Sequence, residues 1–464
     1  MSRLIVISNR VADLNKNVQS GGLAVALADS LRKRGGVWMG WDGETRADAG
    51  ERPPSVKQIG DVTTVTIPLT REDYEEYYLG FANSVLWPLF HYRLDLVNFE
   101  SAFLEGYRRV NKRFADVLVN YVEPDDIIWV HDYHLIPLAT ELRKRGCKNR
   151  IGYFLHIPFP PPDILSAVPD HKWLADSLLS YDLVGFQTQT DLGNFLRYAE
   201  EHVGIHPHPD GSLRFRNRMV RADAFPIGID TDAFAAIAAQ YADEVQIDAM
   251  RRSLLDRQQI IGVDRLDYSK GLPDRMKCFS RLLELYPEHM KRVSFLQIAP
   301  PTREDVDAYA DIRQELESLS GAINGRFADF NWTPIRYIHR SVPRDKLAAL
   351  YRVSRVGLVT PLRDGMNLVA KEYVAAQNPD DPGVLVLSKF AGAAEELTDA
   401  LIVNPYDIDA MAEAVHQALM MPLEERRRRH AALFDRIKRR DALAWQRSFL
   451  STLESLTATD ADAA

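Results

Sequence analysis

The sequence predicts an α/β protein made of two doubly wound domains. Short β-rich runs alternate with longer helical runs, and this alternation restarts in the second half of the chain. The pattern favours parallel strands, because a crossover helix returns the chain to the same edge of the sheet. The length of 464 residues also exceeds what one hydrophobic core usually serves. We expect domains at 1–228 and 229–440, facing each other across a cleft, with the junction near Pro226–Asp232.

In the first half, buried strands are expected where β-branched and aromatic residues cluster between turn residues. These runs are Leu4–Ser8, Val62–Pro68, Ile127–His131, Ile151–His156, Leu183–Phe186 and Ala222–Phe225. Helices are expected where apolar residues recur at helical spacing. These segments are Gly22–Arg34, Arg71–Trp87, Phe103–Val119, Pro137–Arg145 and Asp191–Val203.

The second half repeats the alternation. Its expected strands are Gln259–Val263, Val293–Ile298, Ile335–Ile338, Val356–Thr360 and Val384–Ser388. Its expected helices are Pro273–Tyr286, Arg303–Ile323, Arg344–Val353, Leu368–Ala376 and Ile408–Met420. A last helix, Leu423–Leu456, is long enough to reach the first domain, and we expect residues 441–456 to cross back to it. The small, acidic tail at 457–464 is expected to be disordered.

Bulk composition excludes several functional classes. Apolar and charged fractions of 46% and 26% are typical of soluble proteins. The net charge of −8 disfavours nucleic acid or an anionic membrane as the main partner. We interpret the basic run Arg426–Arg429 as a solvated helix face, because Glu424 and Glu425 precede it. The two cysteines, Cys147 and Cys278, lack the spacing of a metal or redox site, which indicates reduced thiols in the cytoplasm. No apolar run is long enough to span a membrane.

The most informative segment is Pro361–Glu372, PLRDGMNLVAKE, which joins an expected strand to an expected helix. A helix start after a polar, glycine-containing loop binds phosphate, because its first N–H groups lack acceptors within the helix. Glu372 lies one turn into the helix, where a carboxylate suits sugar hydroxyls better than phosphate. The segment therefore predicts a nucleotide-sugar site.

Two cations follow the expected strand Gln259–Val263. Arg265 and Lys270 lie five residues apart in the loop VDRLDYSKG, a spacing that suits a diphosphate. The structural alternative is ion pairing with Asp264 and Asp267.

The first strand is followed by Arg10, which is placed to form a forked contact with phosphate. The alternative is a surface ion pair. Gly21 and Gly22 open the next expected helix and would let a diphosphate approach the backbone, although a plain turn explains them equally well. This segment is not G-x-G-x-x-G, which argues against a nicotinamide dinucleotide.

Histidines and aromatic residues supply further candidates near strand ends. One expected strand ends at a group of polar residues, His131, Asp132 and His134, and another ends at His156. We favour hydrogen bonding of these side chains to sugar hydroxyls over metal binding, because no paired spacing of metal ligands is present. His134 alone is more typical of a structural histidine. A group of aromatic residues in or beside loops is expected to stack on a sugar or orient its phosphate: Trp41, Tyr78 and Trp87. For Trp87, which precedes Pro88, a position in the core is an equal alternative.

With these segments considered, the chain resembles glycosyltransferase family 20, the trehalose-6-phosphate synthases. These are retaining glucosyltransferases of the GT-B architecture, with two Rossmann-like domains. The resemblance runs from Ser2 to about Leu450. The motifs that carry it are SNR (8–10), SGGLAVAL (20–27), GWDGET (40–45), EYY (76–78), VLWPLFHYR (85–93), HDYHL (131–135), FLHIPFP (154–160), RLDYSKGLP (265–273) and LVTPLRDGMNLVAKEYVAAQ (358–377).

The resemblance implies transfer of glucose from UDP-glucose, or another nucleoside-diphosphate glucose, to glucose 6-phosphate. The product is α,α-trehalose 6-phosphate. The resemblance also implies that this reaction is the first step of trehalose biosynthesis and belongs to a stress response. The residues implied for the acceptor are Arg10, Trp41, Tyr78, Trp87, Asp132 and Arg303. Those implied for the donor are Gly21, Gly22, His156, Arg265, Lys270, Val342 through its backbone, Asp364, Leu368, Val369, Ala370, Lys371 and Glu372.

We expect a front-face mechanism without a metal or other cofactor, in which Arg265 and Lys270 stabilise the departing diphosphate. His156 and Asp364 are the other expected catalytic residues, and both contact donor hydroxyls. The expected partners are the two small substrates and, as a homo-oligomer, further copies of the chain in a dimer or tetramer. Two alternatives remain on the residues alone: a nucleotide-sugar epimerase that needs no acceptor, and a sugar-phosphate-binding regulatory protein without catalysis. The identity of the base also stays open between uridine, guanosine and adenosine.

Overall fold

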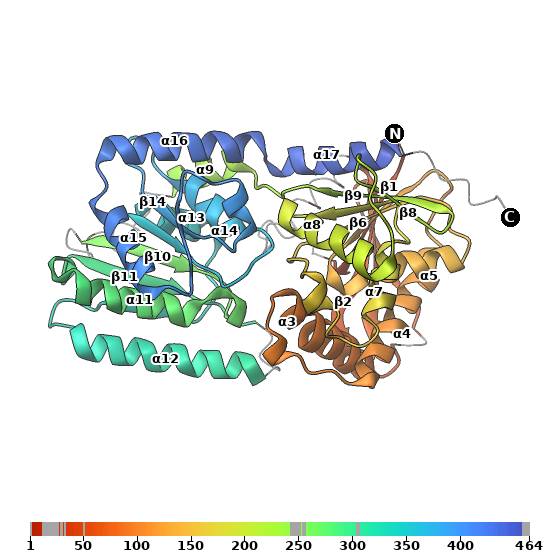
Figure 1. Cartoon of the computed structure of the whole chain (residues 1–464), viewed down its shortest axis with the longest axis horizontal. Coiled ribbons are helices and arrows are strands. Elements are labelled where there is room, and N and C mark those ends of the chain that lie inside the picture. Colours follow the sequence, from red (N-terminus) through yellow and green to blue (C-terminus); the bar gives the residue numbers. More distant parts are fainter. Residues whose placement is uncertain are drawn as a thin grey trace. The chain divides into compact units, whose positions relative to one another are not determined.

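The computed structural model describes the chain except for residues 1, 12–26, 28–30, 32–33, 50–51, 242–251, 253–256, 303–306 and 457–464. It divides into two compact units (Figure 1). The first unit comprises Met1–Ile227 together with Trp445–Ala464, and the second comprises Gly228–Ala444. The α/β class and the two parallel-sheet, Rossmann-like domains expected from the sequence are confirmed.

The first unit is built on a nine-stranded sheet in the order β3-β4-β2-β1-β5-β6-β7-β9-β8. The strands are β1 Leu4–Arg10, β2 Gly36–Thr45, β3 Ser55–Ile59, β4 Val62–Leu69, β5 Ile127–His131, β6 Arg150–Phe154, β7 Leu183–Phe186, β8 Ser212–Phe215 and β9 Arg218–Ala224. The edge strands β3 and β8 pair antiparallel with their neighbours, so the sheet is mixed rather than wholly parallel. Sequence analysis missed β2, because its glycines and acidic residues hide the strand pattern.

The helices of the first unit include one unexpected form. They are α2 Arg71–Asp73, η1 Tyr74–Leu86, α3 Trp87–Phe90, η2 Leu94–Leu96, α4 Ser101–Leu118, η3 Tyr133–Leu135, α5 Leu138–Lys144, α6 Pro162–Leu165, α7 His171–Leu178, α8 Gln189–Tyr198 and η4 Ala199–Val203. The expected helix Arg71–Trp87 is confirmed, but most of it, η1, is a π-helix rather than an α-helix. Asn83 and Ser84 each donate a side-chain hydrogen bond to the carbonyl five residues earlier, at 2.7 Å, which supports the wider turn. Of the expected helix Gly22–Arg34, only three helical positions lie within the described residues.

The second unit is built on a six-stranded sheet in the order β12-β11-β10-β13-β14-β15, and all its strand pairs are parallel. The strands are β10 Gln258–Val263, β11 Val293–Ile298, β12 Ile335–Ile338, β13 Val356–Val359, β14 Val384–Ser388 and β15 Leu401–Val403. The helices are α9 Thr231–Gln240, η5 Tyr268–Lys270, α11 Leu272–Leu285, η6 Pro287–His289, α12 Asp307–Phe327, α13 Arg344–Val353, α14 Leu368–Ala376, η7 Gly392–Glu395, α15 Ile408–Met420 and α16 Leu423–Arg439. In Figure 1, α11 and α12 lie on one side of this sheet, and α13, α14 and α16 lie on the other.

The long C-terminal helix expected at Leu423–Leu456 is two helices, α16 and α17 Ala442–Ser455. The break follows Arg440, and the Asp441 carboxylate accepts the N–H of Ala444 at 2.7 Å, as an N-terminal cap does. Phe449 of α17 stacks on Trp129 and packs within the first unit. Gly152 leaves space for this ring, because a Cβ there would lie 2.8 Å from it.

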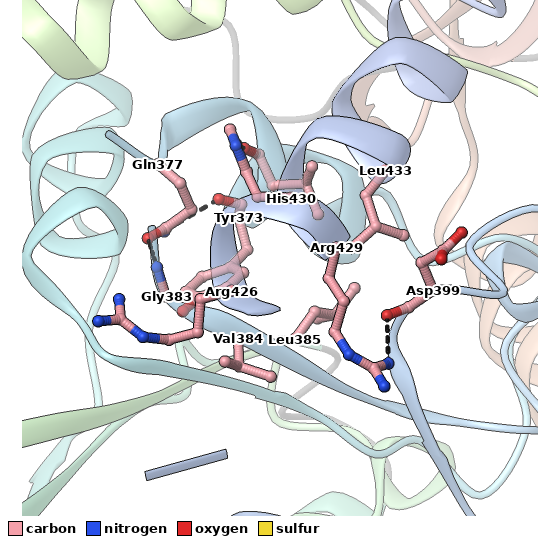
Figure 2. A pocket seen from close by; sticks show the side chains of 11 residues that line it. Tyr373, Gln377, Gly383, Val384, Leu385, Asp399, Arg426, Arg429, His430 and Leu433 are labelled. Atoms are coloured by element: carbon pink, nitrogen blue, oxygen red, sulfur yellow. Dashed lines mark hydrogen bonds between the residues drawn. The ribbon is translucent and has the colours of Figure 1, made fainter. Parts of the chain in front are cut away.

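The basic run Arg426–Arg429 on α16 is not a simple solvated face. Arg426 is buried and forms an ion pair with Asp381 at 2.6 Å. Arg429 pairs with Glu425 and donates to the Asp399 carbonyl at 2.9 Å. Figure 2 shows both arginines at the narrow cavity between α14, β14 and α16. The run therefore holds α16 against the second sheet.

Both cysteines are free thiols. None of the helices in the described part of the chain is long and apolar enough to cross a membrane.

Candidate functional site

In each sheet, the first strand in the sequence lies in the interior, and the strand order runs outwards from it in both directions. Several predicted site residues lie at the carboxyl ends of the strands at this point or in the loops that follow them. In the second unit, β10 lies between β11 and β13, and the loops after β10 and β13 carry Lys270 and Asp364. In the first unit, β1 lies between β2 and β5, and Arg10 and Asp132 lie at the ends of β1 and β5. Ligands of open α/β sheets bind at such reversals, beyond the carboxyl ends of the strands.

The centre of the second-unit site is an ion pair between Lys270 and Asp364. The Lys270 ammonium lies 2.5 Å from the Asp364 carboxylate, and both side chains are largely buried. The Asn367 amide also donates to Asp364, at 3.0 Å. Residues separated by 94 positions are therefore held in one cluster, with Lys270 at the end of η5.

A second, deeper ion pair supports this centre, and sequence analysis missed it. Arg275 of α11 is fully buried and contacts the Asp264 carboxylate at 2.8 Å. Arg275 also donates to the Lys270 carbonyl at 3.2 Å, while Asn367 donates to Asp264 at 3.3 Å. Burial raises the pKa of Asp264, and the nearby Arg275 and Lys270 charges oppose that rise. A chain of polar contacts thus runs from Arg275 to Lys270 and Asp364.

The two loops are also tied through their backbones. The Ser269 carbonyl accepts the N–H groups of Leu362 and Arg363, at 2.8 and 3.3 Å. Gly271 has φ +63°, and a Cβ there would lie 2.5 Å from the Thr360 carbonyl, so only glycine fits this approach. The alternative considered for Lys270, pairing with Asp267, does not occur: Lys270 pairs with Asp364, while Asp267 accepts from the Ser269 N–H and from the Tyr309 hydroxyl.

The start of α14 follows directly from this cluster. Asn367 has φ +70° and caps the helix by accepting the N–H of Ala370 at 3.3 Å. The N–H groups of Leu368 and Val369 precede any possible acceptor within the helix, so the α14 start can receive an anion. Lys371 takes no direct part through its side chain, which is fully buried and pairs with Glu396 at 2.5 Å. The donor role expected for Lys371 is therefore limited to its backbone.

Glu372 has a shifted pKa. Glu372 is half-buried in the first turns of α14, and the partial desolvation of its carboxyl group raises its pKa from 4.5 to about 7. The charge of Arg344 opposes the rise. A carboxyl group in this state can both donate and accept hydrogen bonds near neutral pH, which suits hydroxyl recognition.

Two further donor candidates lie at the rim of the second-unit site. Arg265 is exposed in the loop after β10. Val342 is half-buried and lies between β12 and α13, where its backbone is on a connecting segment. The structure places Arg265 and Lys270 in the same segment between β10 and α11.

In the first unit, Arg10, Trp41 and Tyr78 lie in one cluster. The Arg10 guanidinium lies 4.8 Å from the centre of the Trp41 ring, a cation–π contact. Trp41 contacts Tyr78 at 5.5 Å between centroids, and Tyr78 stacks on His134 at 5.9 Å. Tyr78 lies on the π-helix η1, and Trp41 is buried on β2 rather than in or beside a loop.

Trp87 is also a core residue. It begins α3, is 4% exposed, and packs on His91 and Tyr133, with ring centroids 4.2 and 5.6 Å away. Tyr133 in turn donates to Asn83 of η1 at 2.9 Å. Of the two positions considered for Trp87, the structure therefore supports the core, where its side chain helps to position the π-helix.

His156 and Asp132 lie together at the ends of β6 and β5. His156 shares a hydrogen bond of 3.1 Å with His131, and its backbone N–H donates to the Asp132 carboxylate at 3.3 Å. Burial lowers the pKa of His156 to about 3, so its ring is neutral at working pH. Asp132 has φ +73°, an uncommon conformation for a residue other than glycine, which fixes the direction of this turn.

Three predicted residues lie outside the described part of the chain: Gly21, Gly22 and Arg303. Among the others, the structure brings together two groups, one in each unit. Sequence analysis missed Arg275, and it gave no supporting role to three residues that it had noted or that lie in its motifs: Asp264, Asn367 and His131. The signal for Asn367 was its place directly before a helix, which is typical of a cap. The second-unit group can bind an anionic phosphate, while the first-unit group offers an arginine, aromatic rings and neutral hydrogen-bonding groups.

Comparisons with known proteins show which family the chain resembles. The sequence model of glycosyltransferase family 20 matches residues 5–455. A trehalose-6-phosphate synthase of Enterobacter sp. (strain 638) is 48% identical over 458 residues, covering 98% of this chain and 96% of the relative. The structure of a UDP-forming α,α-trehalose-phosphate synthase from Burkholderia xenovorans in complex with glucose-6-phosphate is 51% identical, with a TM-score of 0.93 over 98% of this chain and 100% of that one. A structure from E. coli bound with UDP-2-fluoro glucose is 47% identical, with a TM-score of 0.94 over 98% and 100%.

Proposed function

The chain belongs to glycosyltransferase family 20, and on that premise we propose that it transfers glucose from UDP-glucose to glucose 6-phosphate. The products are α,α-trehalose 6-phosphate and UDP. The observation that carries the proposal is the Lys270–Asp364 pair beside the start of α14, at the strand reversal of the second sheet. Names and ligands of the similar proteins support the choice of both substrates.

The donor is assigned to the second unit. Lys270 and Arg265 neutralise the diphosphate, and the first N–H groups of α14 bind it from the other side. Asp364 accepts hydroxyls of the glucose, and Glu372 binds the ribose. Val342 presents its backbone to the base. The family resemblance also implies donor contacts for Gly21, Gly22 and His156.

The acceptor is assigned to the first unit. Arg10 and Arg303 bind the phosphate of glucose 6-phosphate, because a guanidinium forms paired hydrogen bonds with phosphate oxygens. Tyr78 and Asp132 are assigned to the phosphate and sugar hydroxyls. Trp41 supports Tyr78 by ring contact, and Trp87 packs on Tyr133, the residue after Asp132.

The reaction proceeds with retention at the anomeric carbon, by a front-face route. The C1–O bond to the diphosphate breaks while the acceptor hydroxyl approaches the same face, and the departing phosphate oxygen takes that hydroxyl's proton. Lys270 and Arg265 stabilise the negative charge that develops on the leaving group. The neutral His156 ring orients a donor hydroxyl by hydrogen bonding, and it does not act as an acid because its pKa is about 3.

Catalysis requires no metal ion in this proposal, because two cationic side chains and the N-terminus of a helix stabilise the negative charge of the diphosphate. Full activity is expected in excess chelator. A loss of activity that added metal restores would contradict the proposal. The wider assignments rest on the same premise: trehalose biosynthesis in the cytoplasm, a stress response, and a homo-oligomer of two or four chains.

The direct test is an assay of the purified protein with glucose 6-phosphate and UDP-, GDP- or ADP-glucose. We expect nucleoside diphosphate and a non-reducing disaccharide phosphate with two α linkages, identified by NMR, and fastest turnover with UDP-glucose. Donor consumption at the same rate without glucose 6-phosphate would contradict the proposed transfer. Arg10→Ala should raise the KM for glucose 6-phosphate more than the KM for the donor, and equal changes would argue against the acceptor assignment.

A further inference from the structure

A histidine pair in the second unit lies outside both groups described above. His289, in η6, and His416, near the end of α15, face each other with His289 Nε2 and His416 Nδ1 only 2.9 Å apart. One of the two nitrogens must be unprotonated, since a hydrogen bond needs an acceptor. A lone pair is therefore already directed into the space between the rings.

A carboxylate completes this cluster. Glu288 precedes His289 in η6, and one ligand atom from each of Glu288, His289 and His416 lies within 4.8 Å of the others. His289 is buried, His416 is partly exposed and Glu288 is exposed. Within the described residues, this is the only group of three or more histidine, cysteine or acidic side chains with such spacing.

The rings are held in orientation before any ligand binds. Tyr286 stacks on His416 with centroids 3.8 Å apart and planes within 6°. His416 and Tyr286 also line an open groove with Glu413 and Gln417, which gives access from solvent. The site therefore has a fixed side, formed by the buried His289, and an open side.

From this geometry we propose that Glu288, His289 and His416 bind a divalent transition-metal ion of the zinc type. Two imidazole nitrogens and one carboxylate oxygen are ligands that zinc accepts, with a fourth position left for water. Zn–N bonds of about 2.0–2.1 Å in a tetrahedral site require nitrogens about 3.3 Å apart. The two nitrogens need to separate by about 0.4 Å from 2.9 Å, and the rings need to turn until both lone pairs meet at the ion, as the shared proton leaves.

This ion would not take part in glucosyl transfer. η6 leads into the amino end of β11, whereas Lys270 and Asp364 follow the carboxyl ends of β10 and β13. In a parallel sheet these are opposite edges. The ion would instead join η6 to the end of α15 and stabilise the second unit, because binding to the folded state alone raises stability.

The test is a Zn²⁺ titration of chelator-treated, full-length protein, by calorimetry and by competition with a chromophoric chelator. All variants carry Cys147→Ser, since that partly exposed thiol is an independent zinc ligand. We expect one ion per chain, a higher Tm with Zn²⁺ but not with Mg²⁺, and at least about tenfold weaker binding in His416→Ala. Anomalous diffraction at the zinc edge should place the ion between the two rings.

Three comparisons keep the result interpretable. His206→Ala removes an exposed histidine paired with Glu200 in the first unit, and should leave zinc affinity unchanged. Glu288→Gln changes an exposed side chain, so it should fold normally and still weaken binding. Zinc affinity that is unchanged in both His416→Ala and Glu288→Gln, or the absence of saturable binding at one ion per chain, would overturn the proposal. Transferase activity of the metal-free protein is expected to equal that of the zinc-bound protein.

Discussion

The two units carry the same kind of strand reversal but build different sites upon it. The second-unit site depends on charges buried in pairs, from Arg275 and Asp264 to Lys270 and Asp364. The first-unit site depends on ring contacts around Tyr78 and on a π-helix. A departing diphosphate develops charge, so its site benefits from cations fixed before the reaction. A sugar phosphate that must bind and orient benefits more from shape and stacking. Four predictions test this contrast, in order of decreasing effect.

The largest effect is expected for Arg275→Met. The change leaves the Asp264 carboxylate buried without its nearest cation, which costs about 3–5 kcal/mol of folding free energy. Turnover should also fall, because Arg275 supports the Lys270 carbonyl. The measurement is chemical denaturation of the variant together with kcat.

Arg281→Met is the matched control on the same helix. Arg281 is part-exposed and pairs with Asp409 and Glu284 on the surface, so its loss should cost no more than about 1 kcal/mol. Equal losses in the two variants would mean that the buried pair has no special role in the second unit.

Lys270→Ala should lower kcat by about 10²–10³-fold, equivalent to about 3–4 kcal/mol, because one cation at the leaving group is lost. The KM for glucose 6-phosphate should change little, since that substrate is assigned to the other unit. Steady-state kinetics with each substrate varied in turn gives both values. A wild-type kcat would refute the leaving-group role of Lys270.

Glu372→Gln should alter how stability depends on pH. The pKa of Glu372 is raised to about 7 in the folded protein, against 4.5 in the unfolded chain. The contribution of this carboxyl group to the free energy of unfolding is therefore fully present below pH 4.5 and is lost as the pH rises through 7. The variant should equal the wild type below pH 4.5 and be more stable above pH 7, by at most about 3 kcal/mol. Denaturation at several pH values measures the difference, and a difference that does not change with pH would contradict the shifted pKa.

The smallest effect is expected for Asn83→Ala in the first unit. The change removes the hydrogen bonds that Asn83 makes with the Tyr78 carbonyl and the Tyr133 hydroxyl, at a cost of about 1–3 kcal/mol. Tyr78 would lose its fixed position, so the KM for glucose 6-phosphate should rise while kcat with saturating acceptor stays near wild type. Asn120→Ala, at an exposed helix end, is the control. A larger fall in kcat than in the affinity for glucose 6-phosphate would contradict the proposal that the first-unit site mainly binds and orients the acceptor.

Much of this site could be predicted because its residues follow strand ends. Arg10, Asp132, Lys270 and Asp364 each come directly after a strand or in the loop that follows it, so alternation of strands and helices was enough to find them. Arg275 and Asn83 could not be found in this way. Both lie within helices, where a polar residue is more often exposed, and only the fold shows that they are buried.

The sequence by itself determined the α/β class, the two-part organisation and the loops that carry the donor chemistry, because these depend on local periodicity and on residue type at strand ends. Tertiary structure alone decided three things: that Lys270 pairs with Asp364 rather than Asp267, that Lys371 turns away to Glu396, and that Tyr74–Leu86 widens into a π-helix. The physical reason is common to all three. The partner of a buried polar group is set by which distant segments pack around it, and the cost of leaving such a group unpaired selects one arrangement.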